Sequence, residues 1–369
     1  MTSPVSPLRI AIAGCGNVLG AYLAVVDSLR RQHRVDLVAL CGPAHHRPKA
    51  AHLGIPHFCS EYSELLERSD VDAVVLLTPM RDHAPMAAAA LEAGKHVLME
   101  KPLAVTLEEG RALVDQAGRS EQLLVCAPFT VLSPTFQTIA RRLQAGDIGK
   151  VVAARGRYGW AGPDWTEWFY RPGGGALFDL GVYNLTTLTG WLGPVRRVTA
   201  MAGIAIPERI INGRTIQVEA EDNVQLLLDF GNACFATVLA GFTLQQYRGP
   251  GLELFGTEGT LYQLGDDWDP DGYELWQNSA GCWQYFKESH PDWPWADGLR
   301  HLVECVQDGK SLRVTPAHAY HVLEIMIRAQ DAARDGTART LESNFTPPAF
   351  ENATATTAAH RIHDRTRWV

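Results

Sequence analysis

Three side chains of this 369-residue chain have the types and spacing that proton transfer requires. Lys101 stands within Glu100-Lys101-Pro102, directly after the short apolar run 96–99. Asp179 and Tyr183 are four residues apart, so on a helix they would share one face. A carboxylate beside a phenol orients the phenol and raises its pKa, whereas a nearby ammonium lowers it. We therefore expect Lys101 and Tyr183 to form an acid/base pair, although Asp/Tyr pairs on helices also occur as surface hydrogen bonds.

Glycines and aromatic residues surround the second half of this set. Three consecutive glycines, 173–175, precede Asp179 and allow the backbone to pass close to a flat or bulky group. Aromatic faces with a few polar groups are typical of a pocket that holds a ring-shaped ligand. The same aromatics would also suit the core of a sheet, and that alternative stays open. The predicted substrate contacts are Lys101, Tyr158, Trp165, Asp179 and Tyr183, with Trp160 and Trp168 in the same cluster.

The N-terminus has the pattern of a dinucleotide-binding unit. Leu8 to Ala13 is an apolar strand, a glycine turn follows, and a helix runs to about Gln32. Gly14 allows the tight turn, and Gly16 allows the backbone to approach a pyrophosphate at the helix N-terminus. The third glycine of the usual spacing would fall at Leu19, so the motif is incomplete. An ordinary strand–helix turn is the alternative reading of this segment.

The end of the second strand, Val35 to Leu40, bears on the choice of cofactor. NAD-binding proteins usually carry an acidic residue there, but this chain has Cys41-Gly42-Pro43-Ala44-His45-His46-Arg47. Arg47 or a histidine would neutralise a 2′-phosphate, so NADP is slightly favoured over NAD. A solvated helix start explains the same residues equally well. A metal site is not expected, because no carboxylate or cysteine accompanies these histidines at ligand spacing.

Further strands build a doubly wound sheet that places Lys101 at its edge. Ala73 to Leu77, His96 to Met99 and Leu123 to Cys126 are apolar runs separated by helical segments. Asp82 and Thr106 have the positions of helix N-caps. Open α/β sheets bind ligands at the carboxyl ends of their strands. The predicted cofactor contacts are Gly14, Gly16, Asn17, Val18, Gly42, His46, Arg47, Thr78, Pro79, His83, Glu100, Lys101 and Trp168.

After Phe129 the pattern becomes β-rich. A hairpin of Val224 to Phe230 and Ala233 to Phe242 is expected to turn at Gly231-Asn232. We predict an α/β Rossmann domain over residues 1–127 and an α+β domain, built on a mostly antiparallel open sheet, over residues 128–369. A late helix near 316–334 is expected to pack back on the first domain. The tail beyond Glu342 has no strong pattern and suits a partly disordered segment or an oligomer arm.

Composition narrows the class of protein. The net charge of −8 gives no electrostatic footprint for nucleic acid or an anionic membrane. No apolar run is long enough to span a bilayer, and the polar N-terminus does not resemble a signal peptide. Seven scattered cysteines read as reduced thiols. We therefore expect a cytoplasmic protein with neither a nucleic-acid nor a membrane partner.

These motifs together resemble the glucose–fructose oxidoreductase / inositol dehydrogenase (Gfo/Idh/MocA) family of NAD(P)-dependent oxidoreductases. The matching pieces are Gly14-Cys15-Gly16-Asn17, Thr78-Pro79 with His83, Gly94-Lys95-His96-Val97, Glu100-Lys101-Pro102 and 173–183. The resemblance implies that Lys101 reaches both nicotinamide and substrate, that Asp179 faces the substrate, and that the Lys101–Pro102 bond is cis. It also implies a homodimer or homotetramer formed through the C-terminal sheet.

One departure within the family concerns Tyr183. Many members carry histidine at this position, and tyrosine is similar to the branch of glucose–fructose oxidoreductase, dihydrodiol dehydrogenase and xylose dehydrogenase. The resemblance thus implies hydride transfer between nicotinamide and a secondary alcohol or carbonyl of a sugar, polyol or related cyclic alcohol. Tyr183 would be the acid/base, assisted by Lys101. A redox-assisted glycoside hydrolase and a non-catalytic nucleotide-binding regulator are the alternatives.

Overall fold

The chain is described by a computed structural model that covers residues 6–266, 268–287 and 293–350 and the backbone of 360–361. It divides into two compact units. The first comprises Met1–Phe129 and Pro294–Leu323, and the second comprises Thr130–Trp293 and Glu324–Val369. Most of the tail beyond Glu342, from 351 on, lies outside the described residues apart from the backbone at 360–361.

The first unit contains a six-stranded sheet in the order β3-β2-β1-β4-β5-β6, and every neighbouring pair is parallel. This is the predicted doubly wound Rossmann sheet. Residues of β4 and of β5 after His96 are buried without alternation, because helices cover both faces of such a sheet. The strands are β1 Leu8–Ala13, β2 Val35–Cys41, β3 His57–Cys59, β4 Ala73–Leu76, β5 His96–Met99 and β6 Leu124–Cys126.

Helices connect these strands, and two of their predicted starts can be compared with the structure. Thr106 caps α5 by accepting a hydrogen bond from the Glu109 N–H (3.2 Å), as predicted. Asp82 occupies the N-cap position of α4 but makes no side-chain capping bond there. The helical segments are α1 Leu19–Arg31, η1 Ala44–His46, α2 Arg47–His52, α3 Tyr62–Leu66, η2 Met80–Asp82, α4 His83–Glu92 and α5 Leu107–Arg119.

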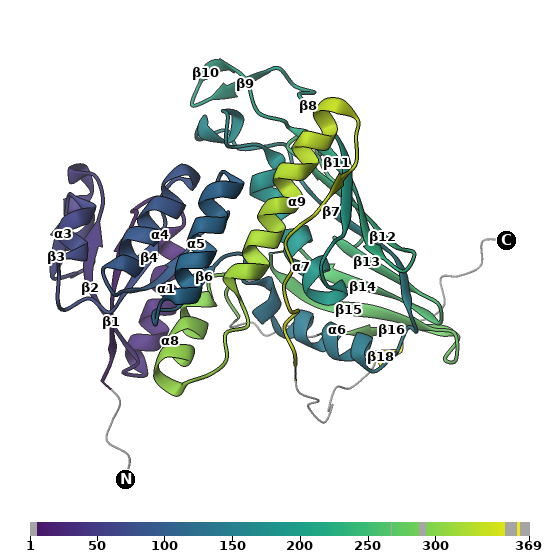
Figure 1. Cartoon of the computed structure of the whole chain (residues 1–369), viewed down its shortest axis with the longest axis horizontal. Helices are drawn as coiled ribbons and strands as arrows, with labels where there is room; N and C mark the ends of the chain where they lie inside the picture. Colours follow the sequence, from purple (N-terminus) through teal and green to yellow (C-terminus); the bar gives the residue numbers. More distant parts are fainter. Residues whose placement is uncertain (1–5, 267, 288–292, 351–359, 362–369) are drawn as a thin grey trace, which may run out of the picture. The chain divides into compact units, whose positions relative to one another are not determined.

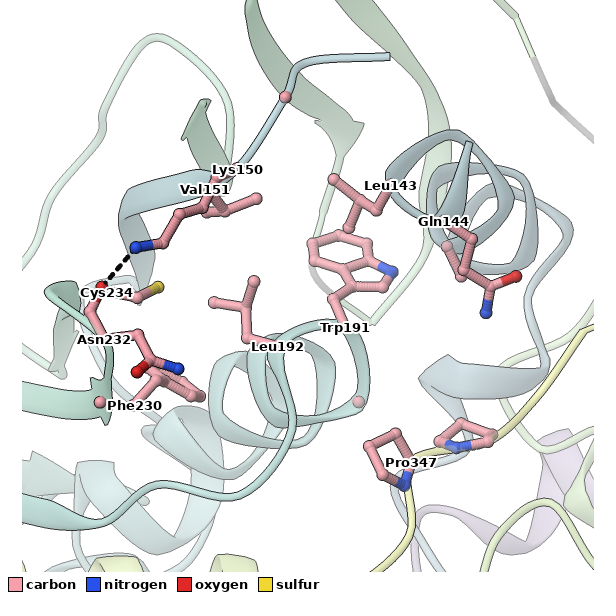
Figure 2. Close-up of a pocket in the computed structure, with 15 residues that line it drawn as sticks. Leu143, Gln144, Lys150, Val151, Trp191, Leu192, Phe230, Asn232, Cys234 and Pro347 are labelled. Atoms are coloured by element: carbon pink, nitrogen blue, oxygen red, sulfur yellow. Dashed lines mark hydrogen bonds between the residues drawn. The ribbon is translucent and has the colours of Figure 1, made fainter. Parts of the chain in front are cut away.

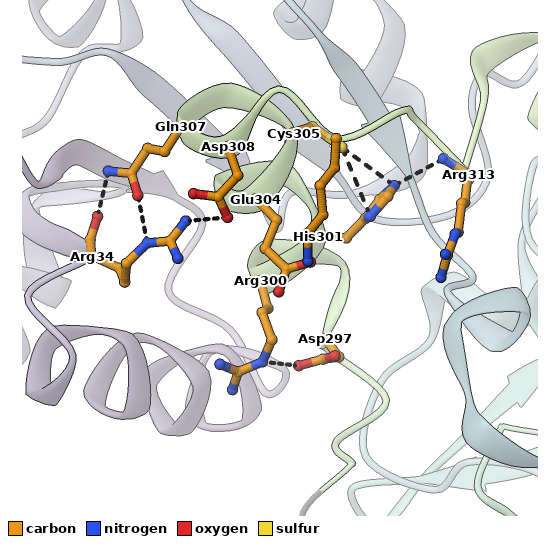
Figure 3. Close-up of polar contacts among 10 residues, drawn as sticks. Arg34, Asp297, Arg300, His301, Glu304, Cys305, Gln307, Asp308 and Arg313 are labelled. Carbon is orange, nitrogen blue, oxygen red and sulfur yellow. Dashed lines mark hydrogen bonds and ion pairs between the residues drawn. The ribbon is translucent and has the colours of Figure 1, made fainter. Parts of the chain in front are cut away.

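Residues 294–323 return to the first unit from far along the chain. The helix α8 (Gly298–Asp308) is joined to the start of β2 by Arg34, which donates to Gln307 Oε1 (2.6 Å) and to Asp308 Oδ2 (2.9 Å) (Figure 3). The helix α9 (Pro316–Asp335) begins after Thr315, whose hydroxyl oxygen accepts the His318 N–H (3.2 Å). The boundary between the units falls within α9, after Leu323.

The second unit is built on a ten-stranded sheet in the order β17-β8-β11-β12-β7-β13-β14-β15-β16-β18. It is antiparallel except where β7 and β12 run parallel, so the expectation of a mostly antiparallel sheet is confirmed. The strands are β7 Val151–Gly159, β8 Arg197–Gly203, β11 Asn223–Gly231, β12 Cys234–Gly241, β13 Leu252–Gly256, β14 Gly259–Gly265, β15 Pro270–Gln277, β16 Cys282–Phe286, β17 Arg339–Thr340 and β18 His360–Arg361.

One predicted turn in this sheet is displaced by a residue. The β11–β12 hairpin turns at Asn232 (φ 54°) and Ala233 (φ 58°), not at Gly231-Asn232. A two-residue turn that matches the twist of the strands needs two successive positive φ angles, and these two residues supply them. Gly231 also has a positive φ but stays paired with Cys234 at the end of the ladder.

Helices cover one face of the large sheet. Figure 1 shows α6 (Pro134–Gln144) and α7 (Val182–Leu192) on the same side of it. The residues of β11 alternate between buried and exposed, as expected for a strand with one covered face. A small two-stranded sheet of β9 (Glu208–Ile211) and β10 (Arg214–Gln217), and the short segments η3 Thr130–Leu132, η4 Trp168–Tyr170 and η5 Leu177–Gly181, complete this unit.

Candidate active site

The glycine turn after β1 has the geometry of a nucleotide-binding turn. Gly14 has φ +104°, and a Cβ there would lie 2.3 Å from the Leu77 carbonyl oxygen, so only glycine fits. Gly16 is exposed with open space where its Cβ would be, and Asn17 is exposed beside it. Val18 is the N-cap of α1 and is half-buried. A phosphate could therefore approach the backbone closely at this helix end.

Leu19 stands where the third glycine of the usual motif would be. Its side chain is completely buried, and α1 begins at this residue. The helix therefore packs into the core at this position through a side chain, and the missing glycine leaves the turn itself intact.

Basic residues gather after β2. Arg47 stacks over the Phe58 ring at 5.0 Å, and Lys49 donates to the Cys15 carbonyl oxygen (3.0 Å) within the glycine turn. Burial and the neighbouring His45 lower the pKa of His46. Gly42 lies against Cys15, with 3.4 Å between a Cβ there and the sulfur. Lys49 was not among the predicted contacts, because its link to Cys15 joins residues 34 positions apart.

The loop after β4 contains a buried hydroxyl without a partner. Thr78 Oγ1 is buried and makes no hydrogen bond, and Pro79 beside it is exposed. His83 is almost fully buried, with Nε2 2.9 Å from the Thr78 carbonyl and Nδ1 2.8 Å from the Pro102 carbonyl. Its pKa is lowered because burial disfavours the charged ring. His83 thus ties the end of β4 to the turn that contains Lys101.

Glu100 and Lys101 follow β5 at the same carboxyl edge. Glu100 is buried, and its two carboxylate oxygens accept the Tyr22 hydroxyl (2.7 Å) and the Lys101 N–H (3.2 Å). Lys101 is half-buried. The Lys101–Pro102 peptide bond is cis, as the family resemblance implied.

Asp179 and Tyr183 stand out from the segment that contains them. Residues 174–190 are all described, and these two alone are not fully buried. Asp179 lies in η5, a π-helical segment of a type that is frequent at functional sites, and Tyr183 lies in the first turn of α7. The accessible polar surface of this segment therefore belongs to a carboxylate and a phenol, each of which is half-buried.

Several aromatic residues of the second unit are paired ring to ring. The rings of Tyr183 and Tyr158 are 5.7 Å apart, edge to face. Trp160 stacks on Trp165 at 5.6 Å, and Trp168 stacks on Phe169 at 3.7 Å. Trp168, a predicted cofactor contact, is 40% exposed and belongs to the second unit. The predicted substrate contacts of the second unit, Tyr158, Trp165, Asp179 and Tyr183, are not fully buried, so each is open to a ligand in part.

The glycine run approaches the chain itself. A Cβ on Gly174 would lie 2.5 Å from the Trp168 carbonyl oxygen, and one on Gly175 would lie 2.9 Å from Glu221 Oε1. The Ala176 N–H donates to the Glu221 carbonyl (3.0 Å), and Gln330 donates to Glu221 Oε1 (2.9 Å). Burial raises the pKa of Glu221. Sequence reasoning missed Glu221, since its partner Gln330 is 109 residues away.

A cavity of about 380 Å³ lies elsewhere in the second unit (Figure 2). Its lining includes Leu143, Trp191, Phe230 and Lys150, whose ammonium donates to the Asn232 carbonyl (2.7 Å). None of the predicted site residues lines it.

Within the described part of the chain, no group of three or more His, Cys, Asp or Glu side chains could hold a metal ion. No helix there is long and apolar enough to cross a membrane.

Two family models match the chain. A model of an oxidoreductase family with an NAD-binding Rossmann fold matches residues 8–127, and a GFO/IDH/MocA C-terminal domain matches residues 136–262. The chain belongs to the Gfo/Idh/MocA family. It is therefore an oxidoreductase with an NAD-binding Rossmann domain, and the family expected from its motifs is confirmed.

The chain is similar to oxidoreductases that are named for inositol, a dTDP-linked sugar and a dihydrobenzenediol. The chain is 27% identical to scyllo-inositol 2-dehydrogenase (NAD(+)) of Bacillus subtilis, over 89% of this chain and 95% of that enzyme. It is 31% identical to dTDP-3,4-didehydro-2,6-dideoxy-alpha-D-glucose 3-reductase of Streptomyces violaceoruber, over 70% and 73%. Trans-1,2-dihydrobenzene-1,2-diol dehydrogenase of Danio rerio is 28% identical, over 88% and 96%.

Solved structures share the fold. Levoglucosan dehydrogenase in complex with NADH and levoglucosan matches with a TM-score of 0.81 at 21% identity, over 91% of this chain and 99% of that one. An oxidoreductase domain protein from Kribbella flavida matches with a TM-score of 0.82 at 23% identity, over 92% and 100%.

Proposed function

We propose that this oxidoreductase transfers hydride between a nicotinamide cofactor and a secondary alcohol of a sugar, a polyol or a related cyclic alcohol. The relatives named for inositol, dihydrodiol and levoglucosan support this substrate class. The observation that carries the proposal is that Asp179 and Tyr183 are half-buried, whereas the other residues of the segment 174–190 are buried. These two side chains therefore have the most surface in this segment with which to contact a substrate.

Tyr183 is proposed to take the hydroxyl proton during oxidation and to return it during reduction. A phenol ordinarily titrates near pH 10, so it needs a nearby positive charge to act near neutral pH. The proposal assigns that charge to Lys101 and requires its ammonium to reach Tyr183 when substrate is bound. The same ammonium would stabilise negative charge on the substrate oxygen. Asp179 would accept a hydrogen bond from a second hydroxyl of the substrate and so fix its orientation.

A bound nicotinamide cofactor would supply the hydride acceptor for this oxidation, and several features of the first unit fit such a cofactor. Gly14 cannot carry a side chain, Gly16 leaves open space above its backbone, and Thr78 Oγ1 is a buried donor without a partner. We propose that Gly14, Gly16, Asn17 and Val18 meet the pyrophosphate and that Thr78, Pro79, His83 and Glu100 line the rest of the site, with Trp168 from the second unit.

NADP is the proposed preference over NAD. Residues 41–49 contain no acidic side chain that would bind a ribose 2′-hydroxyl or repel a 2′-phosphate. Gly42 adds no side chain there, and His46, Arg47 and Lys49 supply nearby positive or ionisable groups. A relative named for NAD(+) and a solved structure with NADH make NAD the alternative outcome of the cofactor test.

We further propose a homodimer or homotetramer that forms through the bare face of the large sheet. Three apolar side chains on β8, β11 and β12 are exposed on that face: Met201 (83%), Leu227 (47%) and Phe235 (45%). Apolar side chains grouped on one face are typical of an interaction surface.

The seven free cysteines suit the cytoplasm, which keeps thiols reduced, and we place the protein there.

Activity assays with the purified protein test the function. Scyllo-inositol, myo-inositol, D-glucose, D-xylose, levoglucosan and trans-dihydrobenzenediol are each offered with NADP⁺ or NAD⁺, and reduced cofactor is followed by absorbance. Oxidation of at least one substrate, faster with NADP⁺, is expected. Binding of NADPH without turnover of any compound would contradict the proposal, as would cleavage of glycosides with no net reduced cofactor.

A further inference from the structure

Trp165 is related to the proposed acid/base, Tyr183, through a line of aromatic residues. Tyr183 contacts Tyr158 at 5.7 Å between ring centroids. Tyr158 and Trp160 are two residues apart along β7 and its continuation, so they project from the same side of the strand. Trp160 stacks on Trp165 at 5.6 Å. Two rings therefore separate Trp165 from Tyr183 along this line.

A large part of Trp165 is open to solvent. The residue is 45% exposed even though Trp160 stacks on it and Phe169 stands at right angles to it at 6.2 Å. An indole whose one face is covered by another ring is held in a fixed orientation, and the exposed fraction then presents a flat apolar surface.

The loop that carries Trp165 is held from several directions. The β9–β10 hairpin reaches it through Asn212, whose N–H donates to the Asp164 carbonyl (3.0 Å) and whose amide donates to the Trp165 carbonyl (2.9 Å). Tyr170 donates to the Pro163 carbonyl (2.8 Å), and Arg209 donates to the Ala161 carbonyl.

Arg209 is itself fixed, because it pairs with the fully buried Asp222 (3.2 Å) and donates to the Phe242 carbonyl (2.7 Å). In Figure 1 this hairpin lies at one end of the large sheet, beside β8. A surface that is already ordered loses little conformational entropy when it binds a ligand. The loop is therefore preorganised, and its exposed indole is not simply an unpacked side chain.

Polar side chains accompany the exposed ring. Asp164, Glu167 and Asn212 are exposed on the same loop and on the hairpin that holds it. A flat apolar surface with carboxylates and an amide nearby matches a sugar ring, which has apolar C–H faces and hydroxyl groups at its edge. A purely aromatic ring would use the indole but none of these polar groups.

We propose that Trp165 binds a second sugar ring, so that the preferred substrate is a disaccharide rather than a free monosaccharide. The inference rests on the proposed function in one respect, because it takes the sugar ring that is oxidised at Tyr183 as the first ring of the substrate. The second sugar ring would then extend past Tyr158 and Trp160 to Trp165. The inference adds disaccharides, a class of substrate that does not occur in the names of the relatives described above.

The test compares matched sugars on the wild-type protein and on variants. The probes are D-glucose with cellobiose and maltose, D-xylose with xylobiose, D-galactose with lactose, and 4-nitrophenyl β-D-glucoside as a glycoside with an aromatic second ring. The readouts are kcat/KM with NADP⁺ and, separately, affinity by calorimetry with NADP⁺ bound. Trp165→Leu keeps the apolar character but removes the flat face, and Trp165→Tyr keeps a smaller flat face. Trp283→Leu is the matched control, since Trp283 is a half-buried, ring-paired tryptophan on β16 of the same unit.

In at least one pair, the wild type should bind and oxidise the disaccharide about tenfold better than the monosaccharide, the factor expected for one additional aromatic contact. Trp165→Leu should abolish that ratio, Trp165→Tyr should restore part of it, and Trp283→Leu should leave it unchanged. Equal affinity for both members of every pair would overturn the inference, as would an equal loss for both in Trp165→Leu. A preference for the nitrophenyl glucoside over every disaccharide would overturn the assignment of a sugar. If the wild type oxidises none of the probes, the proposed function fails, but the calorimetric ratio still decides the second-ring site.

Discussion

The two sheets of this protein differ in how their residues are buried. This difference determines where the predicted site residues lie on each sheet. Adjacent residues of β5, such as Leu98 and Met99, are both fully buried. Adjacent residues of β11 alternate, with Leu226 at 2% and Leu227 at 47% exposure. Both faces of the parallel sheet are covered by helices, so the predicted cofactor contacts of this unit lie in the loops after the strands. The second sheet carries Asp179 and Tyr183 on its helical cover and leaves the other face bare.

The largest expected effect is on turnover and comes from Tyr183, which lies in the helix α7 that covers the large sheet. Tyr183→Phe should lower kcat by about two to four orders of magnitude, because the ring remains but the proton acceptor is lost. Steady-state kinetics with saturating cofactor measure the change, and the dissociation constant of NADPH should stay within about twofold. Tyr158→Phe is the matched control, since it removes a hydroxyl from the ring in contact with Tyr183. An equal loss in both variants would show that Tyr183 has no special role.

Adjacent truncations test the contrast in burial. Leu98→Ala and Met99→Ala should each lower the free energy of unfolding by about 2–5 kcal/mol, because both remove buried side chains. On β11, Leu226→Ala should cost about the same, whereas Leu227→Ala should cost about 0.5 kcal/mol or less in the dissociated chain. Urea denaturation at low protein concentration measures all four. Similar costs at Leu226 and Leu227 would contradict the assignment of a bare face.

A pH dependence should come from the buried His301 of α8. Burial lowers its pKa from 6.5 to about 4, and its Nε2 accepts the Arg313 N–H (3.0 Å) (Figure 3). The unfolded chain therefore binds more protons below pH 6.5, so the stability that the neutral ring contributes is lost as the pH falls from about 6.5 to about 4. The loss is about 3 kcal/mol at most. Denaturation of wild type and His301→Gln across this range should show a smaller decline in the variant, and identical declines would refute the contribution.

The smallest expected effect concerns assembly. Phe235→Glu should raise the dissociation constant of the proposed oligomer by about tenfold or more, because it places an unpaired charge on the bare face. Light scattering across a dilution series measures this. Ile210→Glu serves as the control, since Ile210 is 67% exposed but lies on the β9–β10 hairpin outside the large sheet. A wild type that is monomeric at every concentration would refute the proposed interface.

The parallel sheet could be predicted closely because its strands are continuous apolar runs between glycine turns and caps. The Thr106 cap and the turn at Gly14 follow from local rules, and the structure contains both. The family resemblance supplied the cis bond before Pro102. The residue types around the β11–β12 turn do not show which two residues have positive φ angles. The turn was therefore predicted one residue before its actual position at Asn232-Ala233.

Long-range contacts account for what the sequence did not reveal. Glu221, beside Gly175, accepts a hydrogen bond from Gln330, and the loop around Trp165 is fixed by Arg209 and Asn212. Tyr158 and Tyr183 were both predicted contacts, but only the fold brings their rings to 5.7 Å. The π-helical η5 likewise has no local signal that we recognised. Pairings over tens of residues leave no trace in spacing or periodicity.

A double-mutant cycle of Lys101→Met and Tyr183→Phe tests the central claim most directly. If Lys101 acts by making Tyr183 an effective acid/base, the two losses in kcat/KM are not additive. The double variant should then be about as slow as the slower single variant, while all three still bind NADPH. Losses that multiply would show that the two residues act independently and would contradict the account.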